Sequence, residues 1–342
     1  MERHNNFDLM RLLAAASVIL SHAFLLAENS QAHDPLMILT GGQTILGLAG
    51  VFAFFTISGY LISQSFEATP SPWQFVAKRA LRIFPGLVAC LAVCAFVVGP
   101  LVSRLGPAAY FARPEPYLFV AHNAVLDVEF NRLPGVEFWA GNIGGIVNGP
   151  LWSLPCEAIL YLILFALGRL RLLVLPVTLI MLAVGIVCLW FDTSGSTLGS
   201  VFWLMGFFAA GMCAYRLRRR GLIAGRWAAL ALAGLVLGAA WGVFVPIFPL
   251  CGSYLVLYLA LERRLPAIPA ARFGDLSYGL YIYGWPVEQC VVYFSGGRAA
   301  WWQVFAIAAA VTPALAFASW HLVEKRCRLG RRRLAPAGAA AD

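Results

Sequence analysis

The chain has 342 residues, of which 61% are hydrophobic and only 12% are charged. Soluble domains are about 45–50% apolar and about 25% charged, so this composition excludes a water-soluble enzyme, a secreted domain and a nucleic-acid-binding module. The net charge of +9 does not change this conclusion, because the basic residues stand in short clusters between apolar runs. That pattern is typical of the signals that orient membrane helices.

Ten apolar runs have about the length that a helix needs to cross a bilayer, which is about 20 residues. They cover residues 8–27, 45–66, 83–104, 148–168, 171–191, 197–216, 226–245, 246–261, 275–294 and 300–323. The eighth run is short and nearly touches the seventh, and a stretch at 116–126 has the pattern of an interfacial or re-entrant segment. The sequence therefore predicts an all-α, polytopic membrane bundle of about ten helices. We expect a transmembrane domain at 1–333 and a short cytoplasmic tail at 334–342.

The distribution of Lys and Arg predicts that both termini are cytoplasmic, because cytoplasmic loops are enriched in these residues. With the N-terminus inside, all but four of the 25 basic residues face the cytoplasm, and the exceptions are Arg104, Arg113, Arg132 and Arg298. The first run lacks a small-residue cleavage site, so we expect a retained span and not a signal peptide.

Two ionisable residues share one face of the first predicted span. Arg11 and His22 are eleven residues apart, which brings them within about 20° of each other around a helix and separates them by about 16 Å along it. Ionisable groups inside a membrane are costly and usually functional, so this face has the pattern of a channel wall. The structural alternatives are that Arg11 extends its side chain to the membrane interface and that His22 hydrogen-bonds to a neighbouring helix.

The fourth predicted span carries a carboxylate in the sequence Asn148-Gly-Pro-Leu-Trp-Ser-Leu-Pro-Cys-Glu157. Glu157 is predicted to lie near the depth of His22, where it would orient the imidazole and raise its basicity. The alternative is a structural glutamate in a polar network around Pro155.

Two further clusters have both functional and structural interpretations. Ser58, Gly59 and Tyr60 lie inside the second span, where small residues also serve helix packing. Arg79 and Arg82 open the third span on one helix face, a pattern that suits phosphate binding but also simple anchoring at the inner surface.

Taken in order, these motifs resemble those of the integral-membrane acyltransferase family three, which includes bacterial O-acetyltransferases of surface polysaccharides. The similar segments are Phe7-Asp-Leu-Met-Arg11 with Ser21-His22, Phe54-Phe-Thr-Ile-Ser-Gly-Tyr-Leu-Ile62, Lys78-Arg-Ala-Leu-Arg-Ile-Phe-Pro85, Gly149-Pro-Leu-Trp-Ser-Leu-Pro-Cys-Glu157, Leu276-Ser-Tyr-Gly-Leu-Tyr-Ile-Tyr283 and Trp320-His-Leu-Val-Glu324.

The resemblance implies an enzyme of the inner (plasma) membrane that moves an acyl group from cytoplasmic acyl-CoA, usually acetyl-CoA, to a hydroxyl of an envelope or lipid-linked glycan. It makes His22 the leading catalytic residue, with Glu157 as a second candidate. It assigns binding of the acyl-CoA donor to three arginines and contacts with the substrates to four other motif residues. It implies no metal cofactor. These residues are Arg11, Arg79 and Arg82 for the donor, and Ser58, Tyr60, Trp152 and Tyr283 for the substrates.

The chain departs from the family pattern in two respects. The family often has a histidine before Trp-Pro, where this chain has Gly284, so the role of that histidine is absent or is served by Glu288 or Tyr283. Some relatives carry an appended extracytoplasmic domain, and we expect none here. Transfer is then completed in the membrane domain or with a separate partner, such as another envelope-polysaccharide enzyme.

Three other functions fit parts of the sequence. A transporter or glycan flippase would use the same intramembrane charges, with His22 as a proton relay. A sensory or scaffolding membrane protein would need His22 and Glu157 only for its structure. An acyltransferase could also modify a small hydroxylated molecule in place of a polymer.

Overall fold

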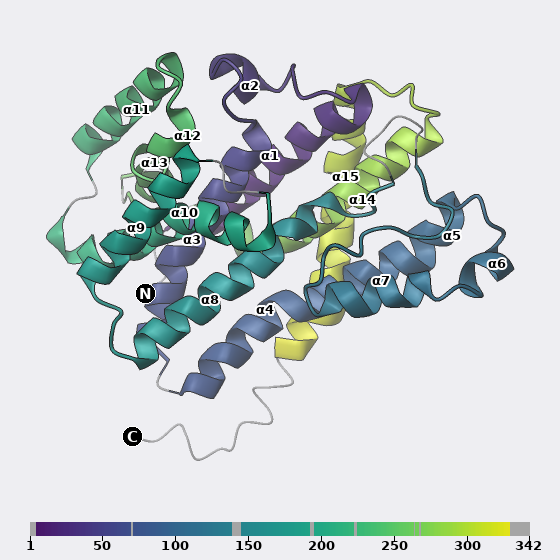
Figure 1. The fold of residues 1–342 in the computed structure, drawn as a ribbon, viewed down its shortest axis with the longest axis horizontal. Coiled ribbons are helices and arrows are strands. Elements are labelled where there is room, and N and C mark those ends of the chain that lie inside the picture. The colour runs from purple at the N-terminus through teal and green to yellow at the C-terminus, as the bar shows by residue number, and fades with distance from the viewer. Residues whose placement is uncertain are drawn as a thin grey trace.

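The computed structural model describes residues 5–69, 71–138, 145–191, 195–221, 224–262, 264–266 and 268–328. All regular structure in these residues is helical and none of them lies in a strand, which confirms the all-α prediction. In Figure 1 the first helix passes through the middle of the bundle, between a group that includes α9, α10, α11 and α13 and a second group that includes α14 and α15. The predicted tail at 334–342 lies outside the described residues.

Among the described residues, six helical segments are long and apolar enough to cross a membrane. They are α1 (Phe7–Glu28), α3 (Leu46–Glu67), the segment Pro72–Val102, the segment Gly149–Arg169, α10 (Thr197–Leu217) and the segment Trp301–Arg328. Three of these segments are composite. The segment Pro72–Val102 joins α4 (Pro72–Val93), a π-helical turn (Cys94–Val98) and α5 (Gly99–Val102). The segment Gly149–Arg169 joins a 3₁₀ turn (Gly149–Trp152) and α8 (Ser153–Arg169). The segment Trp301–Arg328 contains α15 (Trp301–Ser319) and a π-helical turn (Trp320–Glu324).

Each of the four remaining predicted runs also contains a helix, but a shorter or less apolar one. These helices are α9 (Leu175–Trp190), α11 (Gly225–Ala240), α13 (Cys251–Leu261) and α14 (Ser277–Phe294). Helix α14 has 18 residues but carries Glu288, Gln289 and several tyrosines, which lower its mean hydropathy. The structure thus confirms a helical membrane protein, with six candidate spans among the described residues where the sequence predicts about ten.

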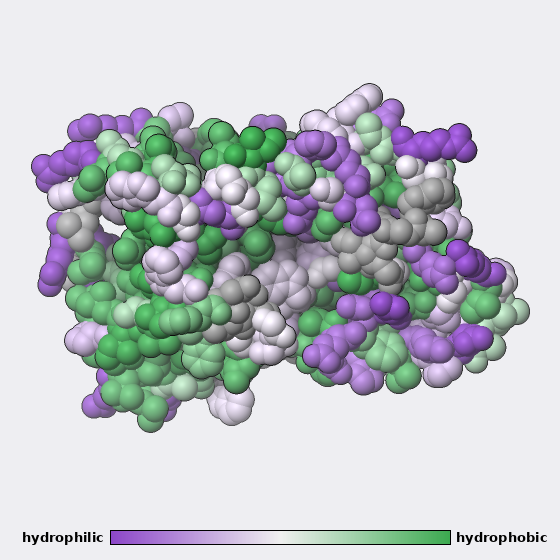
Figure 2. Space-filling view, turned by 45° about the horizontal axis from the view of Figure 1, so that its top comes forward, coloured by the Kyte–Doolittle hydropathy of each residue, from purple (hydrophilic) through white to green (hydrophobic). Residues whose placement is uncertain are grey.

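Much of the molecular surface is apolar, as a protein whose solvent is lipid requires. Figure 2 shows hydrophobic residues over large continuous areas, with hydrophilic side chains gathered mainly towards the rims. Large side chains on α9 and α11 contribute to this exposure: Ile180 is 62% exposed, Trp190 59%, Leu230 63% and Val236 62%. A soluble monomer rarely exposes a contiguous apolar patch larger than a few hundred Å².

Helix α4 begins eleven residues before the third predicted span. Ser71 provides the N-cap, with its Oγ accepting a hydrogen bond from Gln74 N at 3.4 Å, and Pro72 occupies the first helical position. Both residue types favour a helix start. The expectation that Arg79 and Arg82 open the helix is therefore wrong, because both lie inside it and project from its second and third turns.

The connections contain short helices: α2 (Pro35–Leu39), α6 (Pro107–Phe111), α7 (Glu115–Ala124), α12 (Phe244–Ile247) and two 3₁₀ turns at Arg218–Arg220 and Ala270–Phe273. Helix α7 coincides with the predicted interfacial segment and packs against α4.

Glycines allow the central helices to approach closely. A Cβ atom at Gly59 would lie 1.9 Å from the carbonyl oxygen of Phe208, and one at Gly211 would lie 2.1 Å from that of Thr56. Helices α3 and α10 therefore make backbone contact, and their shared packing fixes the direction in which the neighbouring Ser58 points.

Candidate active site

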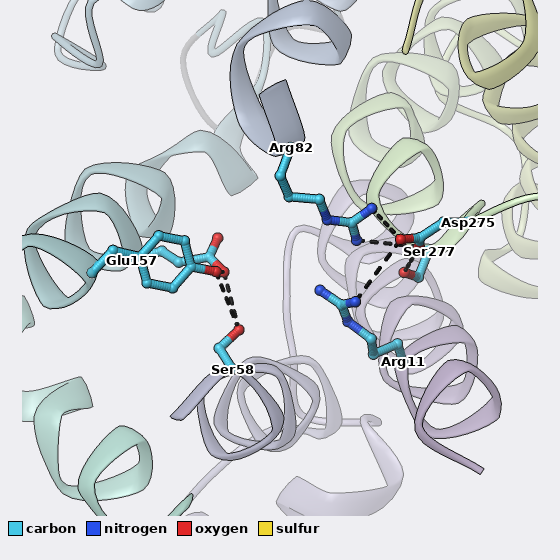
Figure 3. Close-up of polar contacts among 7 residues, drawn as sticks. Arg11, Ser58, Arg82, Glu157, Asp275 and Ser277 are labelled. Carbon is cyan, nitrogen blue, oxygen red and sulfur yellow. Dashed lines mark hydrogen bonds and ion pairs between the residues drawn. The ribbon is translucent and has the colours of Figure 1, made fainter. Parts of the chain in front are cut away.

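Three charged side chains from distant parts of the sequence meet near the start of α1 (Figure 3). Arg82 Nη2 donates a hydrogen bond to Asp275 Oδ1 at 3.2 Å, and its Nη1 donates to the other carboxylate oxygen. Arg11 Nη1 lies 3.9 Å from Asp275 Oδ2, and Ser277 Oγ donates to Oδ1 at 3.0 Å. One carboxylate thus holds the guanidinium groups of α1 and α4 together.

Asp275 lies just before α14 and was not among the residues singled out by the sequence. Burial raises the pKa of its carboxyl, but the guanidinium groups of Arg82 and Arg11 outweigh burial and lower the pKa to about 2. Its position gave a usable signal, because an acidic residue on the predicted cytoplasmic side, where Arg11 and Arg82 of other helices also lie, is a natural ion-pair partner.

The two arginines line a narrow cavity of about 40 Å³. Its walls come from α1, α3, α4, α8 and α14, and its polar lining consists of Arg11, Arg82, Ser153, Glu157, Tyr278 and Tyr281. Since a water molecule needs about 10–15 Å³, the cavity has room for about three water molecules. The structure therefore brings the predicted Arg11, Arg82 and Glu157 to one place.

Arg79 lies next to this cavity and interacts electrostatically with Arg11, Arg82, Glu157 and Tyr161. Its Nε is buried, and within the described part of the chain no acceptor lies in hydrogen-bond distance of that atom. Among the described residues, Arg79 thus lacks the double hydrogen bond to a carboxylate that holds Arg82.

Glu157 faces the arginines from the opposite side of Figure 3. Ser58 Oγ donates a hydrogen bond to its Oε1 at 3.1 Å, and the hydroxyl of Tyr161, one turn further along α8, donates to the same oxygen. The predicted residues Ser58 and Glu157 therefore form one pair. Tyr60 does not join them, because its ring packs 5.3 Å from that of Phe7 and 5.4 Å from that of Tyr215.

His22 does not line the arginine cavity, and Glu157 is not its partner. Its Nδ1 lies 3.7 Å from Oε2 of Glu288, and its ring meets the indole of Trp285 edge-on at 4.8 Å between centroids. The expectation of a His22–Glu157 pair is wrong, because equal depth in a bilayer does not bring two helices side by side. Helix α14 packs against α1 and supplies the carboxylate.

Trp152 and Tyr283 line two other cavities. Trp152 shares an open cavity of about 610 Å³ with Trp203, Gln43 and Ser200. Tyr283 lies in a wide apolar groove of about 900 Å³ between α14 and α15. Of the two residues that the sequence offered in place of the family histidine, Glu288 contacts His22 and Tyr283 points elsewhere.

The site thus has two centres on the same face of α1: the arginine cluster around Asp275 and the His22–Glu288 pair. Within the described residues, no group of three His, Cys, Asp or Glu side chains is arranged to hold a metal ion.

Comparison with known proteins identifies relatives along nearly the whole chain. The chain is 29% identical over 338 residues to an O-acetyl transferase of Shigella phage Sf6, covering 95% of this chain and 96% of the relative. It is 30% identical over 367 residues to nodulation protein 10 of Rhizobium leguminosarum bv. viciae, covering 97% of each. A putative membrane-bound transacylase of Komagataeibacter xylinus is 24% identical over 313 residues, 83% of this chain and 72% of the relative.

No solved structure matches the chain significantly. The model of the acyltransferase domain family matches residues 4–321, a range that contains both centres of the site. With its apolar helices and this match, the chain belongs to the acyltransferase domain family, and it is a membrane acyltransferase.

Proposed function

We propose that this protein transfers an acyl group, most simply acetyl, from cytoplasmic acyl-CoA to a hydroxyl of an exported polysaccharide or its lipid-linked precursor at the inner membrane. The observation that carries this proposal is the shared face of α1, with Arg11 in an arginine cluster at one end and His22 beside a carboxylate about 16 Å further along. In this arrangement both termini are cytoplasmic, as the basic residues predict, and the arginine cluster faces the compartment that holds acyl-CoA.

The arginine cluster suits the phosphates of the donor, because guanidinium groups bind phosphate through paired hydrogen bonds. Arg82 is held in place by Asp275, whereas the Nε of Arg79 has no acceptor among the described residues and would pair with an incoming phosphate. The cavity beside them has room for only a few water molecules, so binding of the pantetheine arm would require it to widen along α1 towards His22.

His22 would act as the general base. It takes the proton of the acceptor hydroxyl while that oxygen attacks the thioester carbonyl, and the departing CoA thiolate takes the proton back from the imidazolium. A positioned base contributes about 10²–10⁴ in rate. A second route passes through an acyl-imidazole: the ring nitrogen displaces CoA first, and the acceptor hydroxyl then displaces the imidazole.

The cavity of Trp152 and Trp203 fits a sugar acceptor. Two flat aromatic side chains offer the apolar faces on which a sugar ring can stack, and Gln43, which lines the same cavity, is held in place by bonds to the backbone of Thr40, Ala239 and Phe244. The name of the phage relative, an O-acetyl transferase, supports transfer to oxygen, and the match of the whole chain supports a shared reaction.

The proposal is tested with purified protein, radiolabelled acetyl-CoA and isolated envelope glycans, by measuring both free CoA and label on the glycan. We expect CoA release and labelled glycan from the wild type and neither from His22→Ala. His33→Ala is the matched control, because His33 also pairs with a carboxylate, Glu28, at 2.6 Å but is 71% exposed. Transfer by His22→Ala at the wild-type rate would reject the role of His22, and no CoA release with any acceptor would favour a transporter.

A further inference from the structure

Glu288 is an ionisable residue that lies completely inside the protein, with 0% exposure. Neither of its carboxylate oxygens has a hydrogen-bond partner in the described part of the chain. A buried carboxylate without a partner is costly, so its presence requires an explanation. The nearest basic group is the imidazole of His22, with 3.7 Å between Oε2 and Nδ1.

The packing of α14 on α1 sets this approach. Gly284 and Glu288 are four residues apart and therefore share one face of α14, as Ile19 and His22 share one face of α1. A Cβ atom at Gly284 would lie 2.9 Å from Ile19 Cγ1, so the missing side chain brings the two helices together. One turn further along, Glu288 reaches His22.

The ring of His22 is held on a second side by Trp285. The two rings meet at 85°, and the indole is itself fixed by a hydrogen bond from its Nε1 to the carbonyl oxygen of Ile146 at 3.1 Å. His22 Nδ1 is buried and, apart from the ion-pair contact, has no partner among the described residues. The imidazole thus has one nitrogen turned towards a carboxylate, and its Nε2 is left for another group.

We propose that Glu288 is the positioning residue of His22: when the substrates bind, the 3.7 Å between Oε2 and Nδ1 closes to a hydrogen bond in which the carboxylate accepts the Nδ1–H and keeps the lone pair of Nε2 available for the acceptor hydroxyl. This inference rests on the proposed role of His22 as the base. Glu288 does not touch the reacting atoms. It fixes the tautomer and direction of the ring and stabilises the imidazolium that forms when Nε2 takes the proton, as carboxylates beside catalytic histidines do.

The kinetic test compares the wild type with Glu288→Gln and Glu288→Ala. We expect a fall in kcat for CoA release of about tenfold or more, with unchanged affinity for acetyl-CoA, because the donor phosphates bind elsewhere. In a His22→Ala background, Glu288→Gln should cause no further loss. Gln289→Ala is the control, since Gln289 is equally buried on the same helix but donates to Ile146 O at 3.2 Å. Wild-type kcat in Glu288→Gln, or an equal loss in the His22→Ala background, would overturn the proposal.

A spectroscopic test separates this inference from the proposed function, because it needs no turnover. The chain has five histidines, so the difference between ¹⁵N-histidine NMR spectra of the wild type and His22→Gln isolates the ring of His22. We expect a protonated Nδ1 and an unprotonated Nε2 in the wild type, and a redistribution of the proton in Glu288→Ala. Identical His22 signals in both proteins would reject the contact, whether or not the enzyme releases CoA.

Discussion

The two centres on the functional face of α1 differ in how their charges are satisfied. Around Asp275 one carboxylate pairs with two guanidinium groups, with Arg82 bonded twice to it and Arg11 in ion-pair distance, so the cluster keeps a net positive charge. Around His22 there is a single imidazole, a single carboxylate and an indole, with no further hydrogen-bond partner for His22 Nδ1 or the Glu288 oxygens among the described residues.

In the proposed function, this difference assigns donor binding to the arginine cluster and the chemical step to His22. A cluster of arginines held by one carboxylate keeps permanent positive charge in place, which a polyanionic donor needs. A lone imidazole in an apolar pocket carries a proton that can move, which general-base catalysis needs. Substitutions in the two centres should therefore change different quantities.

The largest effect is expected at the catalytic centre. His22→Gln should lower kcat by about 10²–10⁴-fold, because the positioned base is lost, while the affinity for acetyl-CoA stays within about twofold. Single-turnover rates together with equilibrium binding of acetyl-CoA to detergent-solubilised protein distinguish the two quantities. Loss of donor binding in this variant would mean that the two centres are not separate.

The next largest effect is expected on stability at the other centre. Asp275→Ala leaves the guanidinium of Arg82, whose side chain is 12% exposed, without its counter-charge. Breaking a buried ion pair costs about 3–5 kcal/mol, and partial exposure places this pair at the lower end of that range. Reversible unfolding in mixed detergent measures the loss. The double variant Asp275→Ala with Arg82→Leu should recover part of it, and an additive loss would contradict this account.

A smaller and more selective effect is expected for Arg79→Gln. Because the buried Nε of Arg79 has no acceptor among the described residues, its removal breaks no hydrogen bond at that atom and should cost less stability than Asp275→Ala, about 1 kcal/mol or less in the free energy of unfolding. If it binds a donor phosphate, the dissociation constant of acetyl-CoA should rise about tenfold. Arg104→Gln is the control, since Arg104 is 67% exposed and pairs with Glu137 at 2.8 Å. Equal donor affinity in both variants would remove Arg79 from the site.

The smallest effect is expected for Ser58→Ala. It deletes one of the two hydrogen bonds to Glu157 Oε1 and leaves that from Tyr161, so the cost should be about 1 kcal/mol in stability with a change of a few-fold at most in kcat. Tyr161→Phe provides the comparison. A loss in kcat as large as that of His22→Gln would place Ser58 and Glu157 in the chemistry and not in the wall of the donor cavity.

Much of the site could be predicted from local sequence patterns. The eleven-residue spacing of Arg11 and His22 places them on one helix face whatever surrounds the helix, and the motif residues Arg82 and Glu157 do line one cavity. Ser58 and Tyr60 are two residues apart, about 200° around the helix, so they face different neighbours, and the contact of Tyr60 with a substrate stays a prediction.

The sequence by itself determined that lipid surrounds this protein, that its fold is helical, and which face of α1 carries the candidate residues Arg11 and His22. These properties follow from composition and helical periodicity, which do not depend on the tertiary structure. Only the tertiary structure decided which partners those residues meet. Asp275 reaches Arg82 across 193 positions of sequence, and Glu288 in place of Glu157 reaches His22. Such pairings depend on which helices lie side by side, and that is decided by close packing at positions such as Gly59 and Gly284, where the absence of a side chain lets two helices approach.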